Sequence, residues 1–210
     1  GHEDTPEQDS YVKATGHPKY RADDAMWLFP TVYKYIAETG DTAFMDEVIP
    51  FCDYDEGTVT EHLKRAIDFT MHHLGGHGMP AGLHADWNDC LQLGANGETS
   101  FVAFQFYYAL NLLEELLPDR PENDEYRAWL KATAADQLKK INQWFWEDDR
   151  FLRGYSQDGM VIGSKHDLEA SMWMNPQCWA VISRGGTPEQ NEKAMESVHR
   201  ELNTPNGIEL

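Results

Sequence analysis

Residues 100–117 read SFVAFQFYYALNLLEELL, and this segment decides the fold class that we predict for the chain. Large apolar side chains recur along it in steps of three and four residues, at positions 101, 104, 108, 112 and 116. Because an α-helix turns once in about 3.6 residues, this spacing places them on one helix face. The segment therefore predicts a long helix with one side in a hydrophobic core.

Helical spacing continues on both sides of this segment. We expect further helices at residues 23–39, 42–49, 58–74, 122–145, 176–183 and 188–202. Gly40 and the pair Gly75-Gly76 stand where helices should end, and Thr187 before Pro188 is a candidate N-cap. Residues 150–162 predict a short β-hairpin that turns at 156–159. A chain with this many helices and a single hairpin is predicted to be all-α.

The alternation of short and long connections suggests how these helices are arranged. No repeat with a period of about 20–50 residues is visible, which disfavours a solenoid of identical units. Successive antiparallel helix pairs fit a toroid of helical hairpins, in which the long loops gather at one end and form a pocket. We therefore expect residues 1–210 to belong to one helical domain.

The chain is strongly acidic. It carries 17 Lys and Arg residues against 36 Asp and Glu residues, a formal net charge of −19. This charge would repel a phosphate backbone and anionic lipid headgroups, which argues against nucleic-acid and membrane partners. No segment approaches the roughly 20 consecutive apolar residues of a membrane-spanning helix.

Cysteine usage and the two ends of the chain indicate where the protein works and how much of it is here. Cys52, Cys90 and Cys178 are odd in number and widely spaced, which is not typical of a disulfide framework. We therefore expect a reducing compartment, the cytoplasm. The chain begins with Gly1 rather than Met and ends where another apolar segment starts. We expect it to be part of a longer polypeptide, truncated at both ends.

Residues 75–99 interrupt the helical pattern. This connection of about 25 residues is rich in glycine, and loops of that length in compact domains are commonly functional. It contains Asp86-Trp87-Asn88-Asp89. Aromatic faces stack on sugar rings, Asp and Asn side chains hydrogen-bond hydroxyl groups, and a carboxylic acid desolvated by an indole can have its pKa raised toward neutrality. The loop is predicted to bind a carbohydrate, although Asx-rich loops also bond their own backbone, and Asp86 or Asp89 would serve equally as a helix cap.

Three motifs, which occur in the same order as in the family, resemble glycoside hydrolase family 94, the inverting disaccharide phosphorylases formerly grouped as glycosyltransferase family 36. Residues 85–90, ADWNDC, resemble the acid-bearing segment of that family. Residues 23–28, DDAMWL, resemble its double-aspartate helix start, and residues 174–181, MNPQCWAV, resemble its Asn-Pro-Gln-x-Trp segment. The resemblance extends over residues 11–210.

The resemblance implies a helical (α/α)6 barrel with the active site at one end. It also implies phosphorolysis of a β-linked disaccharide of the cellobiose or N,N′-diacetylchitobiose class, with Asp89 as the proton donor and Trp87 lining the sugar site. An inverting hydrolase needs a second carboxylate to activate water, whereas phosphate is already a nucleophile, so one acid is enough. The products are an α-sugar-1-phosphate and a free sugar, with phosphate as co-substrate and no cofactor.

The resemblance further implies that the segments binding the reacting sugar and the phosphate lie outside residues 1–210. We therefore expect this chain to be inactive by itself. Many members of the family are dimers, so a homodimer is among the assemblies implied.

Three other residues are candidates for contacts with the sugar: Asp86, Asp24 and Gln177. One of Asp23 and Asp24 is equally well explained as a helix N-cap, and Gln177 is equally well explained as a buried amide bonded to backbone.

Two alternatives to a phosphorylase stay open, an inverting hydrolase on the same barrel and a non-catalytic carbohydrate-binding helical domain. A zinc site formed by His72, His73, His77 and Cys90 would lack the HExxH or paired CxxC spacing of known zinc motifs, so we predict no metal.

Overall fold

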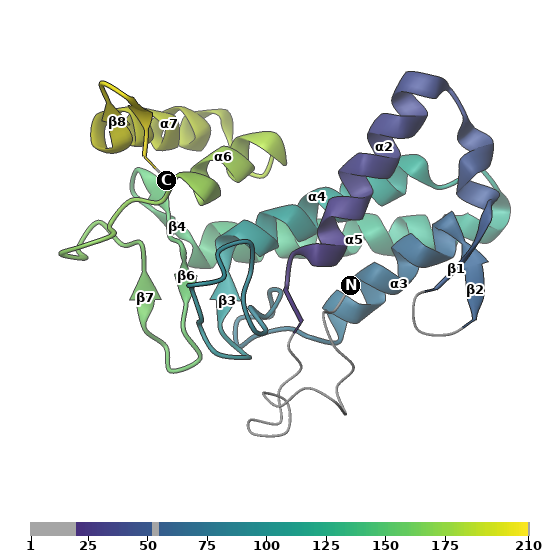
Figure 1. Ribbon diagram of the computed structural model, residues 1–210, viewed down its shortest axis with the longest axis horizontal. Coiled ribbons are helices and arrows are strands. Elements are labelled where there is room, and N and C mark those ends of the chain that lie inside the picture. Colours follow the sequence, from purple (N-terminus) through teal and green to yellow (C-terminus); the bar gives the residue numbers. More distant parts are fainter. Residues whose placement is uncertain (1–19, 52–54, 210) are drawn as a thin grey trace.

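The computed structural model describes residues 20–51 and 55–209, and it is organised around two long antiparallel helices (Figure 1). α4 (Ser100–Leu116) and α5 (Asp124–Trp144) lie side by side along the long axis, with the 3-10 helix η3 (Pro121–Asn123) between them in sequence. Every residue from 100 to 106 at the start of α4 is buried. The long core helix predicted from the spacing of residues 100–117 is confirmed.

Two hydrophobic clusters share α4. The first lies on the side of α2 (Leu28–Thr39) and α3 (Val59–Met71), and its buried members include Phe29, Leu63, Ile67, Phe106 and Leu110. The second lies beside α6 (Met174–Ile182), and its buried members include Phe104, Ile141, Phe145, Phe151 and Ala180. Because α4 contributes to both clusters, its burial positions the helices on either side of it.

Local sequence sets several helix ends. Thr187 forms a capping box with Gln190 at the start of α7 (Pro188–Leu202), which confirms the predicted N-cap. Gly40 ends α2 with a φ of 71°, a left-handed conformation that glycine adopts without strain. The helix predicted at residues 23–39 is observed as the 3-10 helix η1 (Asp24–Trp27) followed directly by α2.

The structure corrects the prediction of a helix at residues 42–49. These residues form the 3-10 helix η2 (Thr42–Asp46) and then β1 (Val48–Pro50), which pairs antiparallel with β2 (Glu56–Thr58). The residue before a proline is restricted to extended conformations, so Ile49 before Pro50 favours a strand.

The predicted hairpin at residues 150–162 is confirmed in its second half alone. β6 (Gly154–Tyr155) pairs with β7 (Val161–Ile162) across the expected turn, and β3 (Glu98–Thr99) joins the other edge of β6. β5 (Arg150–Phe151) pairs instead with β4 (Trp146–Glu147). β8 (Asn203–Thr204) and β9 (Gly207–Ile208) form one more short pair after α7.

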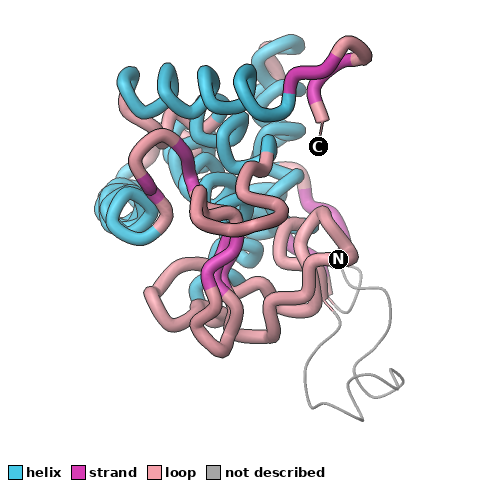
Figure 2. The backbone as a smooth tube through the Cα atoms, turned by 90° about the vertical axis from the view of Figure 1, so that its left-hand side faces the viewer, coloured by secondary structure: helices cyan, strands magenta, loops and turns pink. Residues whose placement is uncertain are grey.

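The long connection between α3 and α4 contains no helix, as predicted. Figure 2 shows loops gathered on one side of the helices, around short strands. The segment before η1, the start of α4 and α6 meet at this end, where Ala22, Phe101 and Val102 pack with Leu83 and Trp179. The described residues are thus mainly helical, and no helix among them is both long and apolar enough to cross a membrane.

Candidate functional site

Residues 20–22, just before η1, are bonded to residues 83–85 of the long loop. The backbone N–H of Ala22 donates to the carbonyl of Ala85 at 2.9 Å, and that of His84 donates to the carbonyl of Tyr20 at 3.2 Å. The backbone of Arg21 forms isolated β-bridges with that of Leu83 and with that of Ala85. Two sequence motifs that lie 60 residues apart are therefore joined through their backbones.

Asp86 anchors the loop on its buried side. Its side chain is fully buried, and its Oδ1 accepts a hydrogen bond from the backbone N–H of Asn88 at 2.9 Å. The Nη2 of Arg153 donates to Oδ1 at 2.8 Å and lies 2.7 Å from Oδ2. The carboxylate therefore shapes the loop, which was one of the interpretations that the sequence allowed.

Asp89 lies on the solvent side of the same turn. Its side chain is 69% exposed, and its Oδ1 accepts a hydrogen bond from the Nε of Arg21 at 2.8 Å. Trp87, two residues earlier, is 52% exposed. An acid and an indole are thus both open to a ligand. The sequence suggested an acid buried against an indole, whereas Asp89 is exposed.

Asp23, from the first motif, is another buried acid of this region. Burial raises the pKa of Asp23 above its ordinary value, the hydrogen bond from Trp27 lowers it, and the nearby charges of Asp86 and Asp24 raise it. That hydrogen bond runs from the Nε1 of Trp27 to Oδ2 of Asp23 at 2.9 Å. Asp23 makes no side-chain cap, so helix capping does not explain it, while Asp24 in the next position is exposed.

The third motif meets the first through aromatic rings. Trp179 of α6 packs edge-on against Trp27, with ring centroids 5.6 Å apart, and contacts Phe101 at the start of α4 in the same geometry. Trp27 is 42% exposed, so its ring is open to solvent at this end of the molecule. The tertiary structure therefore brings all three motifs together.

Gln177, the sugar-contact candidate of the third motif, is bonded to backbone in the structure. Its side chain is fully buried, its Oε1 accepts from the N–H of Phe151 at 2.8 Å, and its Nε2 donates to the carbonyls of Phe151 and Trp173. All of these partners are backbone atoms, so the amide is occupied in joining α6 to β5. This is the structural alternative that we had left open for the residue.

Glu98 is a second buried anchor of the loop, and the sequence did not reveal it. Its carboxylate accepts hydrogen bonds from the backbone N–H of His77 at 2.9 Å and of Met79 at 3.1 Å, and it also contacts the His77 ring. A Cβ added at Gly75 would lie 2.3 Å from the Cγ of Glu98. The glycine is therefore required for the close approach of this acid.

Arg21 and Arg153 were also missed, because neither belongs to a motif. The one local signal was at Arg153, a cation among the apolar residues of a predicted hairpin. Within residues 20–51 and 55–209, no group of three or more His, Cys, Asp or Glu side chains is arranged to hold a metal ion. Cys90 and Cys178 are free thiols, and Cys52 lies outside the described residues.

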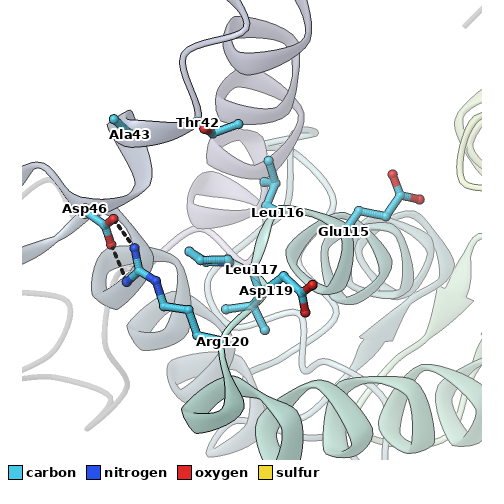
Figure 3. Close-up of a pocket in the computed structure, with 9 residues that line it drawn as sticks. Thr42, Ala43, Asp46, Glu115, Leu116, Leu117, Asp119 and Arg120 are labelled. Atoms are coloured by element: carbon cyan, nitrogen blue, oxygen red, sulfur yellow. Dashed lines mark hydrogen bonds and ion pairs between the residues drawn. The ribbon is translucent and has the colours of Figure 1, made fainter.

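A cavity lies away from these residues. Figure 3 shows this cavity of about 510 Å³, lined by residues 42, 43, 46 and 115–120. The ion pair between Arg120 and Asp46 closes one of its sides. The cavity sits at the C-terminal end of α4. The connection at residues 75–99, here called the acid loop, leads into the N-terminal end, about 25 Å away along a 17-residue helix.

A comparison with known protein families identifies the chain's relatives. The family model described as "Glycosyl hydrolase 94 superfamily, catalytic domain" matches residues 2–210. The chain belongs to this family. Within the glycosyl hydrolase 94 superfamily, it is 36% identical over 191 residues to an N,N′-diacetylchitobiose phosphorylase of Vibrio proteolyticus, which covers 90% of this chain and 24% of that protein.

Other relatives of this glycosyl hydrolase 94 domain act on different disaccharides. A solabiose phosphorylase of Paenibacillus borealis is 32% identical over 193 residues, or 90% of this chain and 25% of that protein. A cellobionic acid phosphorylase of Neurospora crassa is 29% identical over 203 residues, or 95% and 25%. The chain thus spans about a quarter of the length of these curated relatives.

A solved structure supports the fold of the glycosyl hydrolase 94 domain. A rhamnosidase from Klebsiella oxytoca with rhamnose bound superposes with a TM-score of 0.59, covering 87% of this chain and 31% of that one. The two sequences are 13% identical, so this likeness concerns the fold alone.

Proposed function

We propose that this chain is the acid-bearing part of a glycoside phosphorylase, which cleaves a β-linked disaccharide with inorganic phosphate and inverts the anomeric configuration. Asp89 protonates the oxygen between the two sugars, while phosphate attacks the anomeric carbon from the opposite face. The products are an α-sugar-1-phosphate and a free sugar. The disaccharide is of the cellobiose or N,N′-diacetylchitobiose class, to which the named activities of two relatives point.

The observation that carries this proposal is the exposure of Asp89 on a loop that is held on both sides. Its carboxylate is open to solvent, while Asp86 below it is fixed by burial and an ion pair. A general acid must reach the leaving oxygen in a defined direction, and a loop anchored in the core provides that direction. Trp87 and Asp24, both exposed, are the residues that we propose for contacts with the sugars.

We propose that the described helices form part of an (α/α)6 barrel. The support is that the segment leading into α2, the start of α4 and Trp179 of α6 meet at one end of the molecule. A phosphate dianion needs several cationic or N–H donors, and the acid loop itself carries none of the Lys or Arg residues. The remaining donors then come from other parts of the protein, and residues 1–210 alone are inactive.

The test is phosphorolysis by the full-length protein, followed as release of sugar-1-phosphate. Asp89→Asn should lower turnover about 100- to 10,000-fold, the usual contribution of a general acid. Asp46→Asn is the matched control, because Asp46 is also an exposed aspartate paired with an arginine, Arg120, but lies at the far end of α4. It should leave turnover unchanged.

Three results would contradict the proposal. If Asp89→Asn kept the turnover of the wild type, Asp89 would not be the general acid. Release of free sugars in the absence of phosphate would favour the inverting hydrolase. Absence of any turnover, with sugar binding retained in Asp89→Asn, would favour a carbohydrate-binding domain.

The proposed location is the cytoplasm. Cys90 and Cys178 are free in the structure, which agrees with a reducing compartment. Secretion of the intact protein into the medium or the periplasm would contradict this proposal.

A further inference from the structure

A buried arginine far from every motif contacts the acid loop. Arg153 is 1% exposed, and its guanidinium binds the carboxylate of Asp86, 67 residues earlier in the chain. Both side chains are removed from solvent, so each charge depends on the other. The pair ties the acid loop to the strand region that follows α5.

The position of Arg153 is fixed from several sides. Its backbone N–H donates to the carbonyl of Ile162 at 2.8 Å, and its own carbonyl accepts from the N–H of Ser100 at 3.2 Å. Its guanidinium lies 5.4 Å from the ring centroid of Trp173 and 5.9 Å from that of Phe101. An arginine held by backbone bonds and two rings is a rigid point of attachment.

The charge of Arg153 is needed because the site holds two buried acids. Asp23 and Asp86 are both buried and lie close enough for the charge of one to affect the other. Without a cation beside them, two carboxylates in this environment would repel each other and lose their hydration. Arg153 places the opposite charge against Asp86, whose Oδ1 accepts the hydrogen bond from the N–H of Asn88.

The turn made by Asp86 and Asn88 leads directly to Asp89. Asp86 holds the N–H of Asn88, and the Oδ1 of Asn88 accepts from the N–H of Cys90 at 3.1 Å. These two bonds enclose Asp89 on both sides in sequence. A shift of Asp86 is therefore passed on to the direction of the Asp89 carboxylate.

We infer that Arg153 is a positioning residue for the proton transfer: through Asp86 it holds the turn that aims Asp89 at the oxygen between the two sugars. This inference rests on the proposed function, in which Asp89 is the acid. Arg153 itself touches no substrate. Its loss should affect the protonation of the leaving group more than any other part of the reaction.

The experiment compares two substrates of the full-length protein in the presence of phosphate. One is the natural disaccharide, whose leaving sugar must be protonated, and the other is a 2,4-dinitrophenyl β-glycoside of the same non-reducing sugar, whose leaving group needs no proton. Arg153→Lys should lower kcat on the disaccharide about 10- to 100-fold, because a misplaced catalytic group costs rates of this order. The rate on the aryl glycoside should fall by less than about 3-fold.

Arg150→Lys is the matched control. Arg150 is also a buried arginine, three residues earlier, but it pairs with Asp149 and Glu201 and so connects to α7 rather than to the acid loop. It should change the rates on the two substrates by the same factor. A general weakening of the fold would act in this way.

Asp86→Asn is a second variant that decides the question if Arg153→Lys does not fold. It keeps the oxygen that binds the N–H of Asn88 but loses the attraction to Arg153, and it should show the same selective loss. Equal loss on both substrates, or no loss on either, in the soluble variant would overturn the inference.

Asp89→Asn separates this inference from the proposed function. If Asp89→Asn loses the disaccharide selectively while Arg153→Lys and Asp86→Asn do not, the inference alone fails. If Asp89→Asn retains disaccharide turnover, the proposed acid is wrong and the inference fails with it.

Discussion

Replacing Gln177 by methionine tests whether this residue of the third motif serves the fold or a ligand. Methionine is close to glutamine in size, so the change removes the amide without leaving a cavity. The buried N–H and C=O of Phe151 then lose their partners at 2.8 Å. Each unsatisfied buried group costs about 1–3 kcal/mol, so we expect a loss of about 2–5 kcal/mol in the free energy of unfolding.

The assay is thermal unfolding of the purified protein followed by circular dichroism. For a domain of about 150–250 residues, 1 kcal/mol corresponds to about 2–4 °C in Tm, so the expected decrease is about 5–15 °C. Gln143→Met is the control, because Gln143 is an exposed glutamine on α5, and it should change stability by less than about 0.5 kcal/mol. An unchanged Tm together with a raised KM for the disaccharide would refute the reasoning and return Gln177 to the sugar site.

Two further predictions concern the loop and the buried acid of the first motif. Gly75→Ala should destabilise the protein and lower turnover, because the added methyl group would lie 2.3 Å from the Cγ of Glu98. Gly76→Ala is the control: a Cβ there meets nothing within 4 Å, so the change should be neutral in thermal unfolding. Equal effects of the two substitutions would contradict the close approach of Gly75 and Glu98. Burial raises the pKa of Asp23, so between the ordinary and the raised pKa the folded protein binds a proton that the unfolded chain has released, and stability falls as pH rises through this range. Asp23→Asn should therefore be more stable than the wild type at neutral pH. The difference should vanish below about pH 3, where Asp23 is protonated in both the folded and the unfolded protein. Denaturant titrations that show the same difference at every pH would contradict the effect of burial.

Helix spacing and caps were readable from the sequence because they depend on neighbours within a few residues. The apolar period of residues 100–117 predicts α4, and Thr187 before Pro188 predicts the start of α7. The helix expected at residues 42–49 is observed only as the 3-10 helix η2, which ends at Asp46, because pairing with β2 decides the conformation of β1. Pairing partners are not a local property of the sequence, so the first half of the hairpin expected at 150–162 was wrong for the same reason.

The candidate site divides in a similar way. The motif Asp86-Trp87-Asn88-Asp89 marks the loop in the sequence, but nothing in it distinguishes the two acids. In the structure, Asp86 is buried on Arg153 and Asp89 is exposed beside Arg21. The difference arises because each acid meets an arginine from a distant segment, one in the core and one at the surface.

Composition and pattern along the chain were enough to establish that the chain is acidic and mainly helical, which segments form the long helices, and which loop carries the acid-bearing motif. These properties follow from composition and from short-range periodicity. The packed fold was needed to show that the three motifs meet at one end of the helices, that Gln177 is bonded to backbone, and that Arg153 and Glu98 anchor the loop. Burial and ion pairing between residues far apart in the chain exist only once the helices have packed, and so no local pattern records them.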